Sequence, residues 1–409
     1  MNCRFCKTPV TQVFADLINS PASNSYLTTQ QLNEPETFYP LKVLTCPKCF
    51  LVQVDEYYKS TEIFSSDYAY FSSFSTSWLA HAKKYCDMMV ERFGYNEQSQ
   101  IIEIASNDGY LLKNFKEKNI PVLGVEPTAN TAAAAKKDFN IDSVIDFFGV
   151  KLAKQLVADG KKADLLLGNN VLAHVPDIMD FVGGMKLVLK EKGVITMEFP
   201  HLYQLVLNNQ FDTIYHEHFS YLSFNTVKQI FEANGLKMFD VQEIPTHGGS
   251  LRIFAKHNDD ASKEITENVS NLLTKEKEAG MLTMDYYSNF QIKIETIKNN
   301  LLEFLLAQKK AGKKVAAYGA AAKGNTLLNY CGIKNDMISF VVDANPAKQN
   351  KFMPASHIPI VLEARIKNDK PDYILILPWN IKDEIVKQLQ YVKEWGCKFV
   401  VPIPKLEVL

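Results

Sequence analysis

Short runs of apolar residues alternate with longer segments of helical periodicity through the middle of the chain, from residue 100 to 258. The apolar runs predict buried strands at 101–105, 121–125, 164–167 and 193–198. Between them, the segments 130–139 and 177–190 predict helices. Strands that alternate with helices in this way are typical of a doubly wound α/β sheet.

The pattern changes after this region. Two further extended segments, 236–243 and 250–257, are joined by a short connection, so we expect them to pair antiparallel at one edge of the sheet. Residues 262–310 are polar and predict long connecting helices. A second, smaller α/β alternation then follows, with predicted strands at 314–318, 338–343, 372–377 and 398–401.

The first 60 residues contain only short extended runs and turns. A segment of this size buries little apolar surface and needs an additional staple to fold stably. We therefore expect three parts in the chain: a small N-terminal lobe (1–60), a doubly wound domain preceded by a helical lid (61–258), and connecting helices with a Rossmann-like unit (259–409).

Charge and apolar content exclude several classes of protein. The 45 Lys and Arg residues balance 46 Asp and Glu residues, so the chain has no basic field for a nucleic-acid backbone. No run of about 18 apolar residues predicts a membrane span, and the N-terminus lacks the pattern of a signal peptide. We expect a cytoplasmic protein without nucleic-acid or membrane partners, either a monomer or a weak homodimer.

Four of the seven cysteines form two CxxC pairs, Cys3/Cys6 and Cys46/Cys49. Two such pairs can complete a tetrahedral Zn²⁺ site, and four thiolates leave no ligand position for water or substrate. The spacing therefore predicts a structural zinc site that staples the N-terminal lobe. Free or redox-active thiols are the alternative, although a redox pair normally stands at a helix start after a strand, which neither pair does.

Polar residues follow the predicted strands of the first α/β unit, where a doubly wound sheet binds its ligands. The first turn lacks a GxGxxG fingerprint and is acidic instead, which suits a ligand with an amino group and a ribose. An acidic residue after the second strand can accept hydrogen bonds from ribose hydroxyls. A third strand ends at residues 146–148, where a carboxylate can meet an adenine amine and a ring can stack on the base. The candidate residues are Glu103, Ala105, Asn107, Asp108 and Gly109 in the first turn, Glu126 and Pro127 in the second, Asp146 and Phe147 in the third, and Asn169 in the fourth. The alternative is that the carboxylates cap helices.

These residues look like the motifs of class I S-adenosylmethionine-dependent methyltransferases. The full ordered set resembles the zinc-containing sugar-nucleotide C-methyltransferases that make branched deoxysugars, and the match covers nearly the whole chain. Besides the cysteine pairs, the set comprises the segments 70–78, 215–218, 247–252 and 319–324. The resemblance implies S-adenosylmethionine as cofactor, structural Zn²⁺, a nucleotide-sugar partner and C-methylation of a 4-keto sugar, at C3.

Methylation of carbon requires a carbanion equivalent, which a base generates by removing a proton beside a ketone. Histidine suits this task because its pKa lies near neutrality. The resemblance carries the base role to His218, with Tyr215, Glu217 and His174 as assistants, and we expect His174 to face the same cleft. An extended segment and a helical turn would orient His216 and His218 differently, so their geometry is open. A second metal site at 216–218 and ordinary loop histidines are the alternatives.

The segment 70–78 is rich in serine and aromatic residues. It is either a helix across the core or a lid, in which Tyr70 and Ser72 touch the cofactor and Ser73 touches the sugar.

In the second α/β unit, a strand leads through a turn of small residues into a helix whose free N–H groups, with Lys323, could bind a diphosphate. Close packing of strand on helix explains the small residues equally well. The candidate substrate contacts are Ser73, His247, Gly319, Lys323, Asn325, Asp343 and Trp379. An O- or N-methyltransferase and a non-catalytic nucleotide-binding scaffold are the rival functions.

Overall fold

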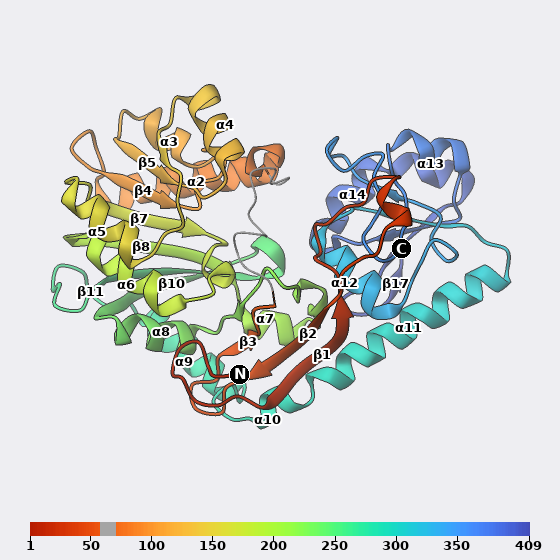
Figure 1. The fold of residues 1–409 in the computed structure, drawn as a ribbon, viewed down its shortest axis with the longest axis horizontal. Coiled ribbons are helices and arrows are strands. Elements are labelled where there is room, and N and C mark those ends of the chain that lie inside the picture. Colours follow the sequence, from red (N-terminus) through yellow and green to blue (C-terminus); the bar gives the residue numbers. More distant parts are fainter. Residues whose placement is uncertain (58–70) are drawn as a thin grey trace.

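A computed structural model of the protein describes residues 1–57 and 71–409. Tyr70 and the boundary expected between residues 60 and 61 lie outside the described residues. Within the described residues the strands form three sheets, of four, seven and six strands. Figure 1 shows the large sheet with its helices on the left, the six-stranded unit on the right, and the N-terminal strands between them at the bottom.

The seven-stranded sheet has the order β10-β11-β8-β7-β4-β5-β6. Its strands are β4 (Ile101–Ile104), β5 (Val122–Val125), β6 (Ser143–Val144), β7 (Ala163–Asn169), β8 (Leu189–Pro200), β10 (Leu236–Ile244) and β11 (Ser250–His257). Its helices are α2 (Thr76–Phe93), α3 (Leu112–Lys116), α4 (Ala129–Phe139), α5 (Val150–Ala158), α6 (Ile178–Val188), α7 (Leu202–Leu207) and α8 (Phe224–Ala233). The expected doubly wound sheet is confirmed, and β10 and β11 pair antiparallel at its edge, as predicted.

The strand order places a ligand crevice in this sheet. Strands β4, β5 and β6 follow one another in one direction, and β7 and β8 follow in the other, all in parallel. The order therefore reverses between β4 and β7, and such a switch point opens a crevice at the carboxyl ends of the strands.

The four-stranded sheet is antiparallel and has the order β1-β2-β3-β9. Its strands are β1 (Gln12–Ser20), β2 (Tyr39–Thr45), β3 (Val52–Val54) and β9 (Ser220–Tyr221). The first three come from the N-terminal lobe, but the fourth comes from the middle of the chain. The segment that contains the predicted catalytic residues thus continues directly into a strand of the N-terminal lobe.

The six-stranded sheet has the order β14-β13-β12-β15-β16-β17, in which β17 alone is antiparallel to its neighbour. Its strands are β12 (Val315–Tyr318), β13 (Val341–Val342), β14 (Ile360–Val361), β15 (Tyr373–Ile376), β16 (Lys398–Val401) and β17 (Glu407–Val408). The helices of this part are α9 (Glu267–Glu278), α10 (Asp285–Ser288), α11 (Phe290–Lys310), α12 (Ala322–Cys331), α13 (Ala364–Asp369) and α14 (Lys382–Gln388).

The strand predicted at 338–343 is shorter than expected. Only Val341 and Val342 pair with both neighbours, while the N–H of Ser339 bonds to the carbonyl of Val315 outside the regular ladder.

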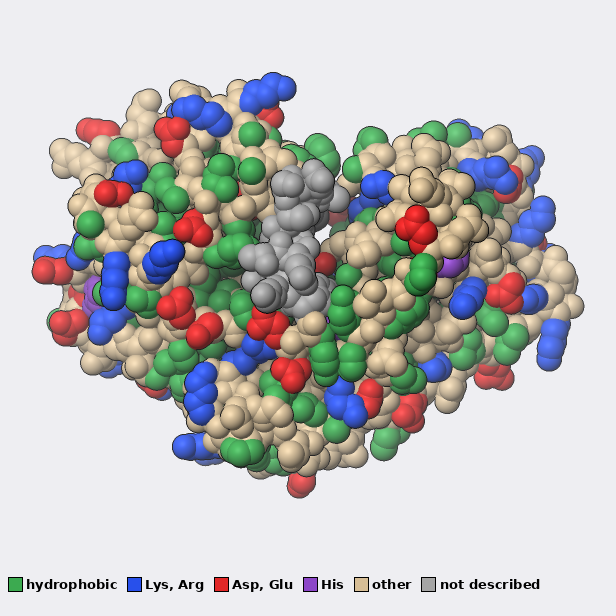
Figure 2. All heavy atoms as spheres, in the orientation of Figure 1, with side chains coloured by type: hydrophobic (Ala, Val, Ile, Leu, Met, Phe, Trp, Pro, Cys, Tyr) green, Lys and Arg blue, Asp and Glu red, His purple; other side chains and the backbone are tan. Residues whose placement is uncertain are grey.

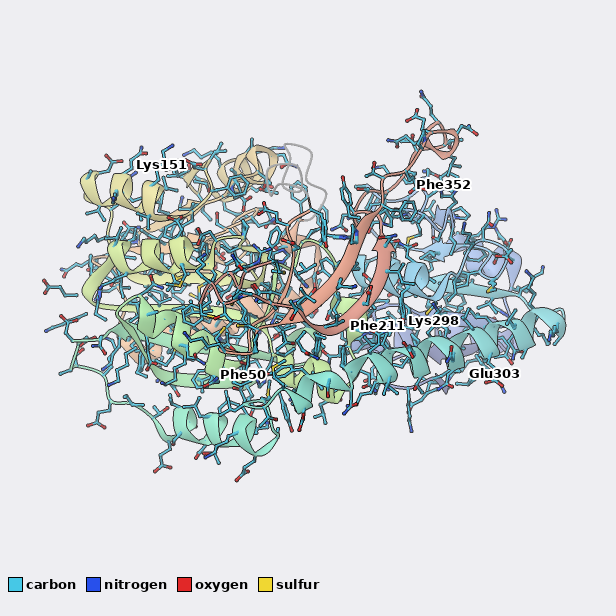
Figure 3. The ribbon with its side chains drawn as sticks, turned by 60° about the horizontal axis from the view of Figure 1, so that its bottom comes forward. Phe50, Lys151, Phe211, Lys298, Glu303 and Phe352 are labelled. Carbon is cyan, nitrogen blue, oxygen red and sulfur yellow. The ribbon has the colours of Figure 1, made fainter. Side chains whose placement is uncertain are left out.

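The small N-terminal lobe shares its core with its neighbours. One continuous apolar cluster joins Phe14 of β1 and Phe219 to Leu301 of α11 and to the six-stranded sheet. A second cluster joins Cys3 and Cys46 to one face of the seven-stranded sheet. Figure 3 shows α11, with Lys298 and Glu303 on it, running along the underside toward the six-stranded unit. The lobe thus packs against both neighbouring units, and these apolar contacts stabilise it in addition to the zinc site.

The surface agrees with the balanced composition. Acidic and basic side chains are interspersed over the face shown in Figure 2, which is notched at the top between the two large units. None of the helices in the described part of the chain is both long and apolar enough to cross a bilayer.

Candidate active site

A cavity of about 350 Å³ opens at the switch point of the seven-stranded sheet, within the size range of small-molecule sites. It continues from the ends of β4, β5 and β7 to the segment that follows α7 and to the start of α12. The predicted site residues in its wall are Ser72, Ala105, Asn107, Glu126, Pro127, Asp146, Phe147, Asn169, His174, Tyr215, His218, His247 and Lys323. The cavity therefore brings together residues that are up to 251 positions apart, from Ser72 to Lys323.

The turn after β4 has an unusual backbone. Ala105, Asn107 and Gly109 all have positive φ angles, of 57°, 49° and 78°. At Gly109 a Cβ atom would lie 2.9 Å from Ile141 Cδ1, so this position requires glycine both for conformation and for packing. Two main-chain N–H groups that precede α2 hold this turn. The N–H of Ser72 donates to Asn107 Oδ1 (2.9 Å), and that of Ser73 donates to Asp108 Oδ2 (3.1 Å).

Glu103 lies fully buried in β4, directly before this turn. Neither of its carboxylate oxygens has a hydrogen-bond partner among the described residues, and the same holds for Asp108 Oδ1. Burial, together with the nearby charges of Asp108 and Glu126, raises the pKa of Glu103 well above its usual value. Unpaired buried acceptors are costly, so this corner suits a ligand that brings a cation and N–H donors.

Glu126 at the end of β5 is tied down by its neighbours. Its Oε2 accepts the N–H of Asn107 (2.8 Å), and its Oε1 accepts the N–H and the hydroxyl of Thr128 (2.9 and 2.5 Å). The carboxylate thus joins the turns after β4 and β5, with the cavity beside it. Asp146 accepts the N–H of Phe147, whose side chain is 40% exposed at the mouth of the cavity. On the opposite side, both side-chain polar atoms of Asn169 are buried without a described partner.

Two histidines and a tyrosine meet at the other end of the cavity. The rings of His174 and His218 are in edge contact, with centroids 4.7 Å apart, and the ring of Tyr215 lies 4.0 Å from that of His218. His218 Nδ1 lies 2.8 Å from the carbonyl oxygen of Thr213. Because a carbonyl can only accept, Nδ1 carries the proton, and Nε2 of the neutral ring is left with a lone pair.

The electrostatic surroundings keep these rings neutral. Burial lowers the pKa of His174 to about 4. Burial, then the neighbouring His174, lowers the pKa of His218 well below its usual value. Nearby Lys323 adds to the effect on His218 and also on His247, whose pKa burial lowers to about 4. At neutral pH the cluster therefore contains neutral imidazoles that can accept a proton.

The segment 215–218 is a turn, so neither the extended nor the helical arrangement applies. His216 points away from His218 and bonds to the carbonyl of Pro40. The carboxylate of Glu217 accepts the side-chain amide of Asn24 (2.7 Å) instead of contacting His218, and burial raises its pKa to about 7. Glu217 instead reaches the cluster through its main chain, which bonds to the ring of His174.

The six-stranded unit reaches the cavity through Lys323, in the first turn of α12. Its ammonium group lies 4.8 Å from the ring centroid of Trp379 and bonds to Asn380 Oδ1 (3.0 Å). The indole N–H of Trp379 donates to Asp212 Oδ2 (2.7 Å), which bridges the two units. Burial raises the pKa of Asp212 to about 6.

The remaining candidates of this unit lie outside the cavity wall. A Cβ atom on Gly319 would lie 2.4 Å from Pro378, which indicates close packing of the turn. The side chain of Asn325 is buried and bonds to the carbonyl of Ser23, and Asp343 accepts the N–H groups of Ala320 and Asn345.

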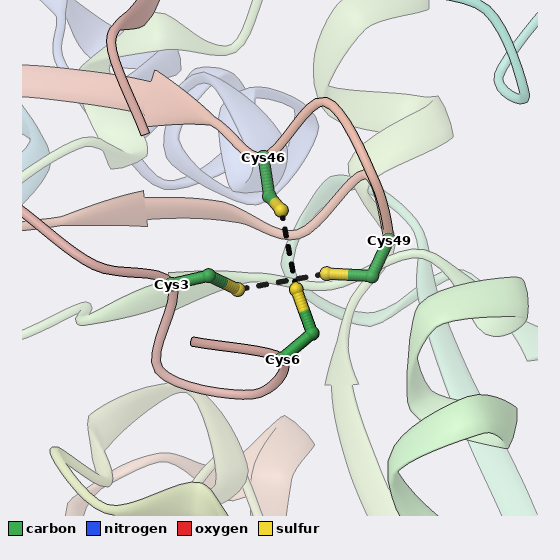
Figure 4. Close-up of side chains that lie close together, drawn as sticks. All are labelled: Cys3, Cys6, Cys46 and Cys49. Atoms are coloured by element: carbon green, nitrogen blue, oxygen red, sulfur yellow. Dashed lines mark hydrogen bonds between the residues drawn. The ribbon is translucent and has the colours of Figure 1, made fainter. Parts of the chain in front are cut away.

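The four cysteines of the N-terminal lobe converge on one point (Figure 4). Their sulfur atoms all lie within 4.8 Å of one another, and the Cys3–Cys49 and Cys6–Cys46 pairs are 3.5 Å apart. A tetrahedron with Zn–S bonds of about 2.3 Å has sulfur atoms about 3.8 Å apart, so the thiols fit Zn²⁺ closely. Among the described residues, this is the one cluster of His, Cys, Asp or Glu with the spacing of a metal site.

Several residues of the cavity wall were not among the candidates that the sequence predicted. Trp78 of α2 lies in the wall, stacks on His81 (4.8 Å) and contacts the ring of His247 (5.2 Å). Asn170, also in the wall, bonds to His247 Nε2 (3.0 Å). No local motif marks these contacts, because they join elements that are distant in the sequence.

A doubly wound sheet with an acidic crevice, a neighbouring pair of neutral histidines and a four-thiol cluster fit the expected zinc-containing, S-adenosylmethionine-dependent methyltransferase. Family models match along most of the chain: "Putative zinc binding domain" at residues 3–64, "Methyltransferase domain" at 78–241 and "C-methyltransferase C-terminal domain" at 245–404. C-methyltransferase NovU of Streptomyces niveus is 32% identical over 407 residues, which cover 100% of this chain and 96% of NovU. The chain belongs to this C-methyltransferase family and is an S-adenosylmethionine-dependent C-methyltransferase.

Solved structures are similar to less than half of the chain. The PH0226 protein of Pyrococcus horikoshii OT3 is 12% identical and covers 49% of this chain and 99% of its own, with a TM-score of 0.38. The magnesium protoporphyrin IX methyltransferase of Synechocystis PCC 6803 is 13% identical and covers 43% of this chain and 82% of its own, with a TM-score of 0.34.

Proposed function

We propose that the protein methylates C3 of a nucleotide-linked 4-keto deoxysugar and that His218 is the base. The observation that supports this most is the bond between His218 Nδ1 and the carbonyl of Thr213, which leaves Nε2 of a neutral ring as proton acceptor beside the cavity. A ketone at C4 acidifies the hydrogens on C3, so an imidazole is a sufficient base.

S-adenosylmethionine supplies an electrophilic methyl group on a sulfonium. His218 takes the proton from C3, and the electron pair of the broken C–H bond passes into the enolate of the sugar. C3 of the enolate would then take the methyl group, and the S–CH₃ electron pair would stay with the leaving S-adenosylhomocysteine. We assign Tyr215, packed against His218, as the donor to the enolate oxygen, because the one N–H of neutral His174 already bonds to the main chain of Glu217.

The turns after β4 and β5 suit the two ends of the cofactor. The unpaired acceptors of Glu103 and Asp108 fit its ammonium group, and Glu126 fits its ribose hydroxyls. We assign Asp146 and Phe147 to adenine and Asn169 to the region between cofactor and sugar, because all three lie in the cavity wall.

Lys323 supports the choice of a nucleotide-linked sugar. It brings a positive charge from the six-stranded unit into the cavity wall, on the side of His218 and His247. A diphosphate between sugar and nucleoside is a natural partner for such a charge, and the nucleoside would then lie toward Trp379 and the end of β15.

The test uses a 4-keto-6-deoxy nucleotide sugar with deuterium at C3, and compares the wild type with His218→Gln. We expect the wild type to give a C-methylated product and to lose the label, and H218Q to lower kcat at least 100-fold. His257→Gln is the matched control, because His257 also bonds to a main-chain carbonyl (Leu189) but lies outside the cavity. Full turnover by H218Q would refute the assigned base, and a methylated product that keeps its C3 deuterium would refute the assigned carbon.

A further inference from the structure

Arg4 stands between two zinc ligands, Cys3 and Cys6, but its side chain leaves the zinc lobe. One terminal nitrogen of its guanidinium donates to the carbonyl of Pro176 (2.8 Å), and the other donates to the carbonyl of Val54 (2.7 Å). The guanidinium carbon also lies 4.9 Å from the ring centroid of Phe219. The side chain is thus held by three segments that are far apart in the sequence.

Two of these segments carry the histidine pair of the cavity. Pro176 follows His174 by two residues and lies in the cavity wall itself. Phe219 directly follows His218 and is 1% exposed. Arg4 therefore contacts the two segments that carry the imidazoles.

The third segment, β3, bonds both to Arg4 and to the residue after His218. The N–H of Val54 in β3 donates to the carbonyl of Phe219 (3.1 Å), while the carbonyl of Val54 accepts from Arg4. Beyond this point β3 pairs with β9, which begins two residues after His218. The zinc lobe thus contacts the catalytic segment through a strand and through Arg4.

The two histidines depend on this brace because they belong to different parts of the fold. His174 follows β7 of the seven-stranded sheet, whereas His218 leads into the sheet of the zinc lobe. Their ring contact of 4.7 Å requires a fixed position of one sheet relative to the other. A planar guanidinium can bond to a carbonyl on each side at once, which the single ammonium group of a lysine does less well.

We propose that Arg4 is a positioning residue that sets the His174–His218 pair, so that the zinc lobe acts on proton transfer through this side chain as well as through β3. The inference rests on the proposed function, because it takes His218 as the base. It assigns the zinc lobe a task in the reaction although zinc touches no reacting atom.

The experiment isolates proton transfer from methyl transfer. The deuterated 4-keto sugar nucleotide is incubated with enzyme and S-adenosylhomocysteine, and the washout of the C3 label into water is followed by mass spectrometry. Arg4→Met keeps the apolar stem and removes both donors, and Arg4→Lys keeps the charge. Arg92→Met is the matched control, because Arg92 also lies over aromatic rings and is paired with Asp240, but neither residue belongs to the cavity wall.

We expect R4M to slow washout and kcat at least tenfold, with one zinc per chain, with the affinity for S-adenosylmethionine and the sugar KM within twofold, and with a shifted pH–rate profile. R4K should slow washout about fivefold. If R4M does not retain zinc, the washout rate of zinc-loaded R4K tests the proposal instead. R92M should leave washout unchanged.

Zinc-loaded R4K or R4M with wild-type washout, while H218Q has lost it, would overturn the inference alone. Washout that persists in H218Q would instead locate the failure in the proposed function.

Discussion

Replacement of His174 by glutamine should make the free energy of unfolding less dependent on pH in the acid range. Burial holds the pKa of His174 at about 4, against an ordinary value of 6.5. Because its pKa is lowered in the folded state, His174 binds its proton more readily in the unfolded chain. Its contribution is therefore constant above pH 6.5, and it turns against folding as the pH falls from 6.5 toward 4. At pH 5 this difference amounts to about 2 kcal/mol.

The assay is urea unfolding of wild type and H174Q at pH 8 and at pH 5, followed by far-UV circular dichroism. The side-chain amide of the introduced glutamine can still donate to the main chain of Glu217, so the variant should fold. We expect the loss of unfolding free energy between pH 8 and pH 5 to be about 2 kcal/mol smaller in H174Q than in wild type. Equal losses in the two proteins would refute the reasoning, because His174 would then titrate alike in the folded and unfolded states.

Three further outcomes follow from the packing and the ligand groups. Gly319→Ala should lower the free energy of unfolding by about 2 kcal/mol or more, because φ is +92° and the new Cβ would meet Pro378. Gly312→Ala, with open space around it, should cost only about 1 kcal/mol. Equal losses in denaturant titrations would count against the packing argument. Cys49→Ser should leave less than one zinc per chain by atomic absorption and lower the melting temperature; full zinc content would contradict the four-thiol site. Glu126→Gln should weaken S-adenosylmethionine binding about tenfold in calorimetry, as expected for the loss of a charged acceptor, and an unchanged Kd would remove Glu126 from the cofactor site.

The roles of the individual site residues stay predictions that these experiments address. The structure does show how the candidates are divided. His174, Tyr215 and His218 share one end of the cavity, whereas the carboxylate of Glu217 is turned to Asn24. The expected location in the cytoplasm and the expected monomer or weak homodimer likewise stay predictions.

Local sequence patterns by themselves predicted the two α/β sheets, the zinc site and the ligand crevice. The alternation of apolar runs with helical segments predicted both α/β sheets, because burial on two faces demands continuous apolar strands. The spacing of two CxxC pairs predicted the zinc site, because four thiolates satisfy one tetrahedral ion. Polar residues at successive strand ends predicted the crevice, because parallel strands end at one edge of a sheet.

Only the tertiary structure decided which distant segments meet. The turn at 215–218 follows neither of the two regular periods, so the directions of His216, Glu217 and His218 could not be derived from spacing. The contact of Arg4 with Pro176 joins residues 172 positions apart. Such pairings depend on how sheets pack, and sheet packing is set by the sum of many weak apolar contacts that no short motif encodes. The four-cysteine cluster was therefore predictable, but the contacts of Arg4 with the segments that carry the histidine pair were not.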